Sequence, residues 1–332
     1  MKRISSSPAK AVACMALIYF GAAKMEAQTI YVGLGGQNGV STNTGAIGSL
    51  NPATGAITPI GTPLPQHAIS GLVFDSSGKL WGSTQIGGGN PPINGVLPPV
   101  TTSTLIQVNP ATGAEISSAL INMGGTPVSI ADLAYQASTN TIFAIQSPND
   151  ANFTGTANLY TLSTTGAATL VGNTGHFFAA IAFAPNGTLY MTSADLPDNE
   201  GSCANGNDVN CSLSTLNPAT AAVITSVPTA DFYSALGVSP SGVIYAGNGG
   251  GDIGGAGTGQ FYPGVSTLNP TTGAATMIGN TGTNFAGDIT FQVQSPATVP
   301  ALTPPMLVVL AVLMILVGGF AGIRRQHNLQ SR

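Results

Sequence analysis

The chain is poor in charge, and above all in positive charge. Only 6% of its 332 residues are charged, and between residues 28 and 303 the single basic residue is Lys79. The same stretch holds eleven acidic residues, so its formal charge is one minus eleven, or −10, against −4 for the whole chain. Nucleic acids and phosphorylated ligands are bound largely through lysine and arginine. The composition therefore excludes nucleic acid and argues against phosphate-bearing ligands.

Residues that carry catalysis are also scarce. The chain has three histidines and one tryptophan, and no Ser-His-Asp motif or histidine cluster stands out in it. Residues 247–259 are rich in glycine, but no lysine lies among them and no helix is expected after them, which excludes a phosphate-binding loop. Hydrophobic residues make up 43% of the chain, enough for a sizeable core. These features favour a folded binding or structural protein over an enzyme.

Residues 1–27 predict a secretory signal peptide. They begin with a basic segment, and the apolar residues 11–23 follow it. Cleavage is expected after Ala23 or Ala27. The rest of the chain is therefore expected to be exported through the inner membrane into an oxidising compartment.

Residues 306–323 predict a transmembrane helix. This run of 18 residues carries no charge and reaches the lower limit for spanning a bilayer. Arg324 and Arg325 follow it directly, and positive charge beside a membrane span marks its cytoplasmic end. Residues 324–332 are then a basic cytoplasmic tail, and residues 295–305 form a proline-containing linker between the exported domain and the membrane.

The linker contains the sequence Val299, Pro300, Ala301 and Leu302. With the helix and the arginines after it, this segment resembles the IPTL-CTERM and PEP-CTERM protein-sorting domains of bacteria. Pro300 and Leu302 match the Ile-Pro-Thr-Leu signature, and the other two positions depart from it. The resemblance implies processing by an exosortase-type membrane transpeptidase, with transient anchoring by the helix before release to the cell surface or extracellular matrix. The alternative is an ordinary C-terminal membrane anchor.

The region between these ends, residues 28–294, repeats one short motif five times. The motif reads Leu-Asn-Pro-x-Thr-Gly-Ala in its fullest form, and its third position is occupied by Pro52, Pro110, Thr164, Pro218 and Pro270. A near-constant spacing of this size indicates an array of one supersecondary unit. Asparagine, proline and glycine in this order are typical of a tight turn.

Each repeat contains four short β-type segments, which in the third copy cover residues 180–183, 188–191, 213–216 and 222–225. Four strands per repeat in an all-β chain predict a β-propeller. The fifth copy lacks a second strand, and residues 29–33 resemble that strand. We therefore expect five four-stranded blades, the last closed by the N-terminal strand; a six-bladed ring or an open solenoid is the alternative. The units also resemble loose propeller repeats of bacterial surface proteins, a resemblance that implies no catalytic residues.

The insertions in the repeats are expected on one face of the ring. They fall between the second and third strands, at residues 84–104, 146–158, 193–211 and 247–264. Insertions gathered on one face of a repeat protein usually mark its binding face.

Alignment of the inner strands places polar residues at one level near this face. His67, Val128, His176, Asp231 and Asn284 occupy the level, and Phe177, Phe232 and Phe285 stand one position later. These residues are candidates for a ligand-binding ring around the central mouth. His67, His176 and Asp231 together are also suitable metal donors. The alternative is that the histidines cap loops and the phenylalanines pack between blades. Asp132 and Asp288 are expected to bond backbone amides rather than act as acids.

The insertion at residues 193–211 is the most acidic. It collects oxygen donors of the kind that Ca²⁺ prefers, namely Asp195, Asp198, Glu200 and Asp208. A solvated loop without an ion is the alternative. Cys203 and Cys211 lie in the same insertion and are the only cysteines left after signal cleavage, so a disulfide is expected, with free thiols as the alternative.

Two functions are compatible with these features. The first is an exported, surface-sorted propeller without catalytic activity, which binds or scaffolds in the cell envelope or matrix with polysaccharide or another surface protein as its partner. The second is a metal-dependent propeller enzyme, lactonase- or lyase-like, with its site at the central mouth. An inert structural spacer is a third and weaker possibility.

Overall fold

The computed structural model describes residues 28–35, 43–64, 68–85, 102–146, 156–176, 178–194, 211–247, 264–282 and 285–292. All of them belong to the first of two compact units, Met1–Val293. The predicted signal peptide, sorting motif, transmembrane helix and arginine tail lie outside the described residues. Within the described ranges, no helix has the length and apolarity that a membrane crossing requires.

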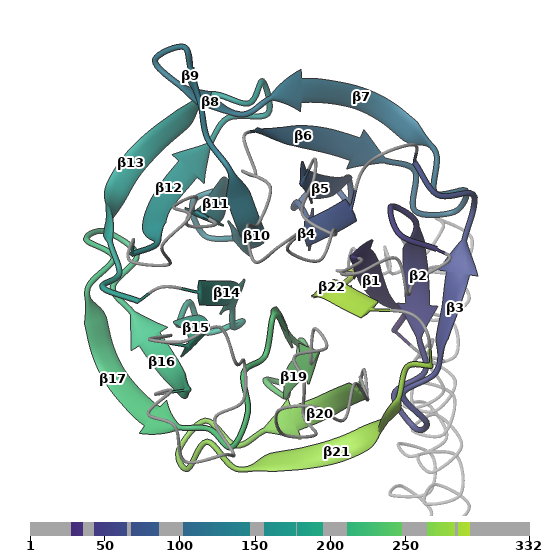
Figure 1. Cartoon of the computed structure of the whole chain (residues 1–332), viewed down its shortest axis with the longest axis vertical. Helices are drawn as coiled ribbons and strands as arrows, with labels where there is room; N and C mark the ends of the chain where they lie inside the picture. The colour runs from purple at the N-terminus through teal and green to yellow at the C-terminus, as the bar shows by residue number, and fades with distance from the viewer. Residues whose placement is uncertain are drawn as a thin grey trace, which may run out of the picture. The chain divides into compact units, whose positions relative to one another are not determined.

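The described residues form five antiparallel four-stranded sheets, arranged as blades around a ring (Figure 1). From inner to outer strand, the first blade is β4 (Ala68–Phe74), β5 (Leu80–Gln85), β6 (Ser103–Val108) and β7 (Glu115–Leu120). The second is β10 (Ile130–Gln136), β11 (Thr141–Gln146), β12 (Asn158–Leu162) and β13 (Ala168–Asn173). The third is β14 (Phe178–Phe183), β15 (Leu189–Ala194), β16 (Ser212–Leu216) and β17 (Val223–Pro228). The fourth is β18 (Ala235–Val238), β19 (Ile244–Gly247), β20 (Gly264–Leu268) and β21 (Ala275–Asn280).

The fifth blade is built from both ends of the propeller, as the repeat pattern predicted. Its strands are β22 (Phe285–Phe291), β1 (Ile30–Gly35), β2 (Ile47–Leu50) and β3 (Ile57–Ile60). β1 pairs antiparallel with β22 in a register that sets Ile30 opposite Phe291. This pairing covers the inner strand's edge and closes the ring, which confirms both the five blades and their closure.

The hydrophobic core lies between neighbouring blades. One cluster joins Ala180 and Leu213 of the third blade to Leu236 and Ile244 of the fourth. Aromatic pairs bridge other blades, for example Phe143 and Phe183, whose ring centroids are 5.2 Å apart in an edge-to-face arrangement. A single four-stranded blade leaves such faces exposed, so burial of apolar surface drives assembly of the whole ring.

The repeated motif forms the turn between the third and fourth strands of each blade. In the first blade, Asn109 Oδ1 accepts a hydrogen bond from the Ala111 amide (2.9 Å), and Gly113 has a φ of +71°. A Cβ atom on Gly113 would lie 2.3 Å from the carbonyl oxygen of Ile60 in the outer strand of the preceding blade. The glycine is therefore needed both for its positive φ and for close packing between blades.

The fourth copy of the motif has alanine where the others have glycine. Ala221 adopts a φ of +62°, and its side chain is fully buried. Ala221 lies against Gly172 of the preceding blade, where an added Cβ would lie 3.2 Å from the Ala221 Cβ and 2.3 Å from the Thr220 carbonyl oxygen. Glycine occupies the equivalent position beside two other copies of the turn, as Gly61 beside Gly113 and Gly279 beside Gly55.

A small hairpin between the first and second blades is absent from the sequence-based prediction. β8 (Asn122–Met123) and β9 (Thr126–Pro127) are joined by Gly124 and Gly125, both with positive φ. The Asn122 amide donates to the carbonyl oxygen of Gly166 (3.0 Å), which ties the hairpin to the second blade. The expectation that insertions occur only between second and third strands was therefore incomplete.

Candidate functional site

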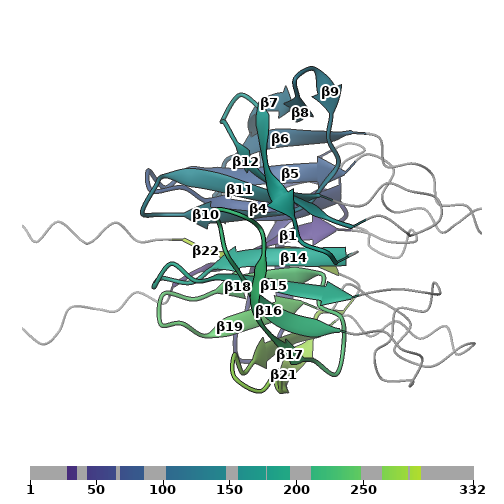
Figure 2. The same ribbon diagram turned by 90° about the vertical axis from the view of Figure 1, so that its left-hand side faces the viewer.

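The strand order places the functional face at one end of the ring. Figure 2 shows the inner strands of the blades running roughly along the ring axis, whereas the outer strands β7, β13, β17 and β21 run around the circumference in Figure 1. Because the first three strands of a blade alternate in direction, the second strand ends and the third begins at one face, where the predicted insertions lie. The connections to the next blade end at this face, as the hydrogen bond from the Ser103 amide to the Val128 carbonyl oxygen shows, but each starts beside the repeated turn of the next blade, as Leu120 does beside Gly166.

The structure describes only part of the predicted ligand ring. His67, Phe177 and Asn284 lie outside the described residues, and for Phe285 only the backbone in β22 is described. His176 is half-buried in the connection from β13 to β14, and its carbonyl oxygen accepts a hydrogen bond from the Ala157 amide (2.7 Å).

Asp231 and Phe232 lie in the connection from β17 to β18 and are both half-buried. Asp231 Oδ1 accepts a hydrogen bond from the Phe232 amide (2.9 Å). Burial, aided by the negative charge of Asp231, raises the pKa of the neighbouring Tyr233 to about 12. Within the described ranges, no three His, Cys, Asp or Glu side chains gather closely enough to hold a metal ion. With His67 outside those ranges, the metal site stays a prediction.

The acidic insertion is mostly outside the described residues. Asp195, Asp198, Glu200, Cys203 and Asp208 all belong to the part that the structure does not describe, so the Ca²⁺ site stays a prediction. Cys211, at the end of the insertion, is buried and disulfide-bonded. Its partner lies outside the described ranges, and the pairing with Cys203 likewise stays a prediction.

Two buried carboxyl groups lie on the innermost strands. Asp132 in β10 and Asp288 in β22 are 0% and 1% exposed, and their side chains are hydrogen-bonded to one another. Each carboxyl group also accepts two backbone N–H groups. Asp132 accepts those of Leu133 (2.8 Å) and Ile181 (2.7 Å).

Asp288 repeats this pattern with the amides of Ile289 (2.6 Å) and Leu72 (2.5 Å). In both cases one amide follows the aspartate and the other belongs to the next blade, at the same level of its inner strand. The two carboxyl groups thus satisfy four of the five aligned amides, which confirms the predicted bonding of Asp132 and Asp288 to backbone. Burial raises the pKa of both groups well above 3.8, and the Asp132 charge raises that of Asp288 further.

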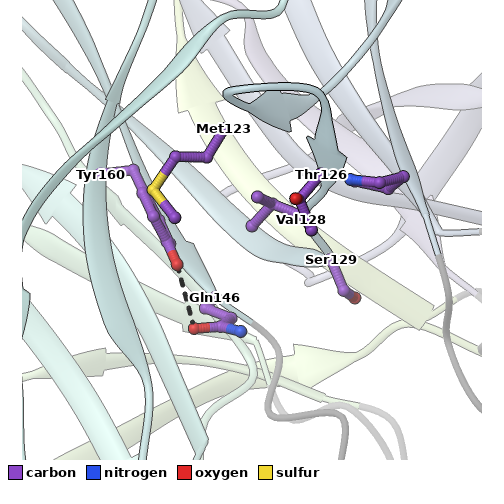
Figure 3. Close-up of a pocket in the computed structure, with 7 residues that line it drawn as sticks. Met123, Thr126, Val128, Ser129, Gln146 and Tyr160 are labelled. Carbon is purple, nitrogen blue, oxygen red and sulfur yellow. Dashed lines mark hydrogen bonds between the residues drawn. The ribbon is translucent and has the colours of Figure 1, made fainter.

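A hollow of about 220 Å³ opens beside the hairpin on the second blade (Figure 3). The connection from β7 to β10 supplies one wall, made of Met123, Thr126, Pro127, Val128 and Ser129. Gln146 of β11 and Tyr160 of β12 supply the other. The lining contains no aspartate, glutamate, histidine, lysine or arginine.

Hydrogen bonds orient the polar groups on the β-strand wall. Gln146 Oε1 accepts from Asn158 Nδ2 (2.7 Å) and from the Tyr160 hydroxyl (3.3 Å). Asn173 Nδ2 in turn donates to Asn158 Oδ1 (2.8 Å). Figure 3 shows the Gln146 amide nitrogen on the side away from the Tyr160 hydroxyl.

Ser129 on the opposite wall differs from these residues. It is 4% exposed, and its hydroxyl is the one buried side-chain polar atom of the described chain that has no hydrogen-bond partner. Leaving a buried hydroxyl unpaired costs about 1–3 kcal/mol. Of the lining residues, the sequence pattern singled out only Val128; the Gly124-Gly125 pair is the signal that could have indicated the hairpin.

No protein-family model matches the chain, and no curated protein is significantly similar to it. Several solved structures resemble its chain trace. A protein of unknown function from Bacteroides caccae is 16% identical, with a TM-score of 0.44, over 81% of this chain and 100% of the other. A gluconolactonase from Xanthomonas campestris is 12% identical, with a TM-score of 0.40, over 80% and 77% of the two chains. The five-bladed fold rests on the strand pairing, and no function follows from likenesses this distant.

Proposed function

We propose that the protein is an exported, surface-sorted propeller that acts as a binding or scaffold module of the cell envelope or extracellular matrix, without catalytic activity. The observation that supports this best is the use of Asp132 and Asp288. They are the buried acidic residues of the described chain, and each accepts hydrogen bonds from two backbone amides. Groups engaged in this way hold blades together and do not meet a substrate.

The proposed location of the protein at the cell surface rests on its terminal sequences. Residues 1–27 direct export, and residues 299–302 with the following apolar run and arginines direct sorting by an exosortase-type transpeptidase. The partner at the destination is matrix polysaccharide or another surface protein.

Surface display tests the sorting. In the bacterium that encodes the protein, intact cells are treated with protease and the remaining full-length chain is measured in each membrane fraction. The wild type is expected at the surface, and a Pro300→Ala/Leu302→Ala variant is expected to stay in the inner membrane. Equal surface display of both chains would show that the tail is an ordinary anchor.

Binding is tested separately. Purified full chain in detergent is incubated with matrix polysaccharide extracted from the same cells, and the bound fraction is measured after sedimentation. Retention of the folded chain, and not of a thermally unfolded control, supports the binding role; equal retention of both contradicts it.

The metal-dependent enzyme is the second candidate. It is favoured by the half-buried His176 and Asp231, which lie in equivalent connections at the same face of the ring. With His67 they would supply two imidazoles and a carboxylate.

A further inference from the structure

We propose that the fourth blade is the part of the ring that opens first, along its junction with the third blade, while the other four blades stay tied at the centre. This opening is a property of the propeller itself and does not depend on the proposed binding function. The innermost strands of the first to the fifth blade are β4, β10, β14, β18 and β22.

The central carboxyl groups tie four of the five blades together. Asp132 of the second blade accepts the Ile181 amide of the third (2.7 Å). Asp288 of the fifth blade accepts the Leu72 amide of the first (2.5 Å). The hydrogen bond between the two aspartate side chains joins these two pairs of blades across the ring axis.

The fourth blade has no part in this tie. Its aligned amide is that of Leu236, and the two positions from which a carboxyl group would reach it are occupied by Ala180 and Ala235. The Ser239 amide donates to the Val243 carbonyl oxygen (2.9 Å), and bonded pairs alternate along an antiparallel ladder, so Leu236 lies at a non-bonded position. Its amide therefore points away from β19, toward a centre where the third blade supplies no side-chain oxygen.

The junction between the third and fourth blades also contains small side chains. Among the described residues, its cluster has eight buried members, three of which are alanines, namely Ala180, Ala182 and Ala246. The cluster between the fifth and first blades also has eight buried members, and none is alanine. Thr192 Oγ1 donates to the Tyr233 carbonyl oxygen across the junction (2.6 Å), but this bond lies ahead of β18. Because the free energy of burial follows the apolar area, this junction gains less from packing.

The inner strand pair of the fourth blade is the shortest among the described residues. β18 and β19 form four residue pairs, from Ala235 opposite Gly247 to Val238 opposite Ile244. The inner pairs of the other four blades form six residue pairs each. Fewer ladder bonds have to break when the fourth blade opens, so its local opening is the most favourable one.

Hydrogen exchange of the full chain in detergent tests this order of opening. Mass spectrometry with electron-transfer fragmentation compares Gly237 with the equivalent ladder amides of the first three blades, which are those of Val73, Ala134 and Ala182. After correction for intrinsic exchange rates, Gly237 is expected to exchange at least tenfold faster. Its exchange should also depend less on urea, because opening one blade exposes less surface than unfolding the whole ring.

Ala180→Asn supplies the missing tie. Its side-chain oxygen is expected to accept the Leu236 amide of the fourth blade, as Asp132 accepts an amide of the third blade (2.7 Å). The variant should slow the exchange of Gly237 at least threefold.

Ala235→Asn is the matched control. Its side chain is expected to accept the Leu236 amide from within the fourth blade, as Asp288 accepts the Ile289 amide (2.6 Å), and it adds no bond to the third blade. Exchange of Gly237 should therefore stay within twofold of the wild type.

Three results would overturn the proposal. One is exchange of Gly237 in the wild type as slow as that of Val73, Ala134 and Ala182. Another is equal urea dependence of the four amides, since the ring would then open as one unit. The third is a folded Ala180→Asn variant that slows Gly237 no more than the control does. If Ala180→Asn does not fold, the two wild-type measurements decide.

Discussion

Asp132 and Asp288 are hydrogen-bonded to one another although they belong to blades that are not neighbours in the ring. Their strands, β10 and β22, flank β4 of the first blade on either side. β4 carries Gly71 at the aligned position, where an added Cβ would lie 2.6 Å from the Leu133 amide nitrogen. The carboxyl groups and the glycine together link the second, first and fifth blades at the innermost strands.

This link predicts a specific pH dependence of stability. Because the folded pair holds its proton more tightly than the unfolded chain, its contribution is complete below the ordinary carboxyl pKa of 3.8 and is lost as the pH rises through the raised pKa. Within that window, the free energy of unfolding is expected to fall by up to about 1.4 kcal/mol per pH unit. Urea unfolding at a series of pH values above 4 measures the slope.

Asp288→Asn supplies the control for this slope. The amide offers one acceptor oxygen for the Leu72 and Ile289 amides, so one of them is left unpaired at a cost of about 1–3 kcal/mol. The variant is expected to be less stable at pH 4 and to lose most of the slope. A slope equal to that of the wild type would show that the pair is not its source.

Acidification should affect the first blade through Asp75. Burial opposes ionisation of this carboxyl group, but hydrogen bonds from Ser77, from Trp81 and from backbone amides outweigh it and lower the pKa. Its stabilising effect is therefore present above pH 3.8 and is lost as the pH falls through the lowered pKa. Trp81 is the one tryptophan of the chain and donates Nε1–H to Asp75 Oδ2 (2.9 Å), so its fluorescence should report this step.

Ser77→Ala tests the assignment of the Trp81 signal. Without the hydroxyl hydrogen bond (2.6 Å), the midpoint of the fluorescence change should move upward toward the ordinary carboxyl value. Asp75→Asn should lack the transition. An unchanged midpoint in the first variant would assign the signal to another group.

The repeated turn predicts opposite effects of two matched substitutions. Ala221→Gly relieves a positive φ of +62° and should stabilise the protein by up to about 1 kcal/mol. Gly273→Ala introduces a Cβ 2.0 Å from the carbonyl oxygen of Pro228 at a φ of +71°, and should destabilise by about 2 kcal/mol or more. Thermal unfolding of both variants measures the difference, and changes of the same sign would contradict this account of the turn.

The candidate metal site yields a prediction that distinguishes the two functions. If His67 and His176 ligate a metal, the purified full chain should hold about one ion per molecule, and the His67→Ala/His176→Ala variant should lose it, because removing imidazole donors weakens the site. Elemental analysis of both chains measures this. A stoichiometric ion that both chains retain belongs to another site, and the acidic insertion with Asp195 and Asp208 is then the candidate.

Periodic features of the propeller could be predicted from the sequence. The motif around Pro52 and its four copies indicated the repeat, and residues 29–33 indicated that the N-terminal strand completes the last blade. These predictions succeed because each repeat encodes its own strands and turns through local residue preferences. The β8–β9 hairpin was missed because it occurs once and has strands of two residues each, too short for a periodic pattern.

The sequence by itself determined the four-stranded unit, the number of blades, and the asparagine, proline and glycine of the turn, since all of these depend on neighbours along the chain. Only the tertiary structure decided that Asp132 meets Asp288, that Ala221 lies against Gly172, and that Met123 of the hairpin lines a hollow together with Gln146 and Tyr160. These relationships join residues of different strands or blades. Closure of the ring and packing of its blades bring these residues together. A local sequence pattern does not encode contacts between residues that are far apart along the chain.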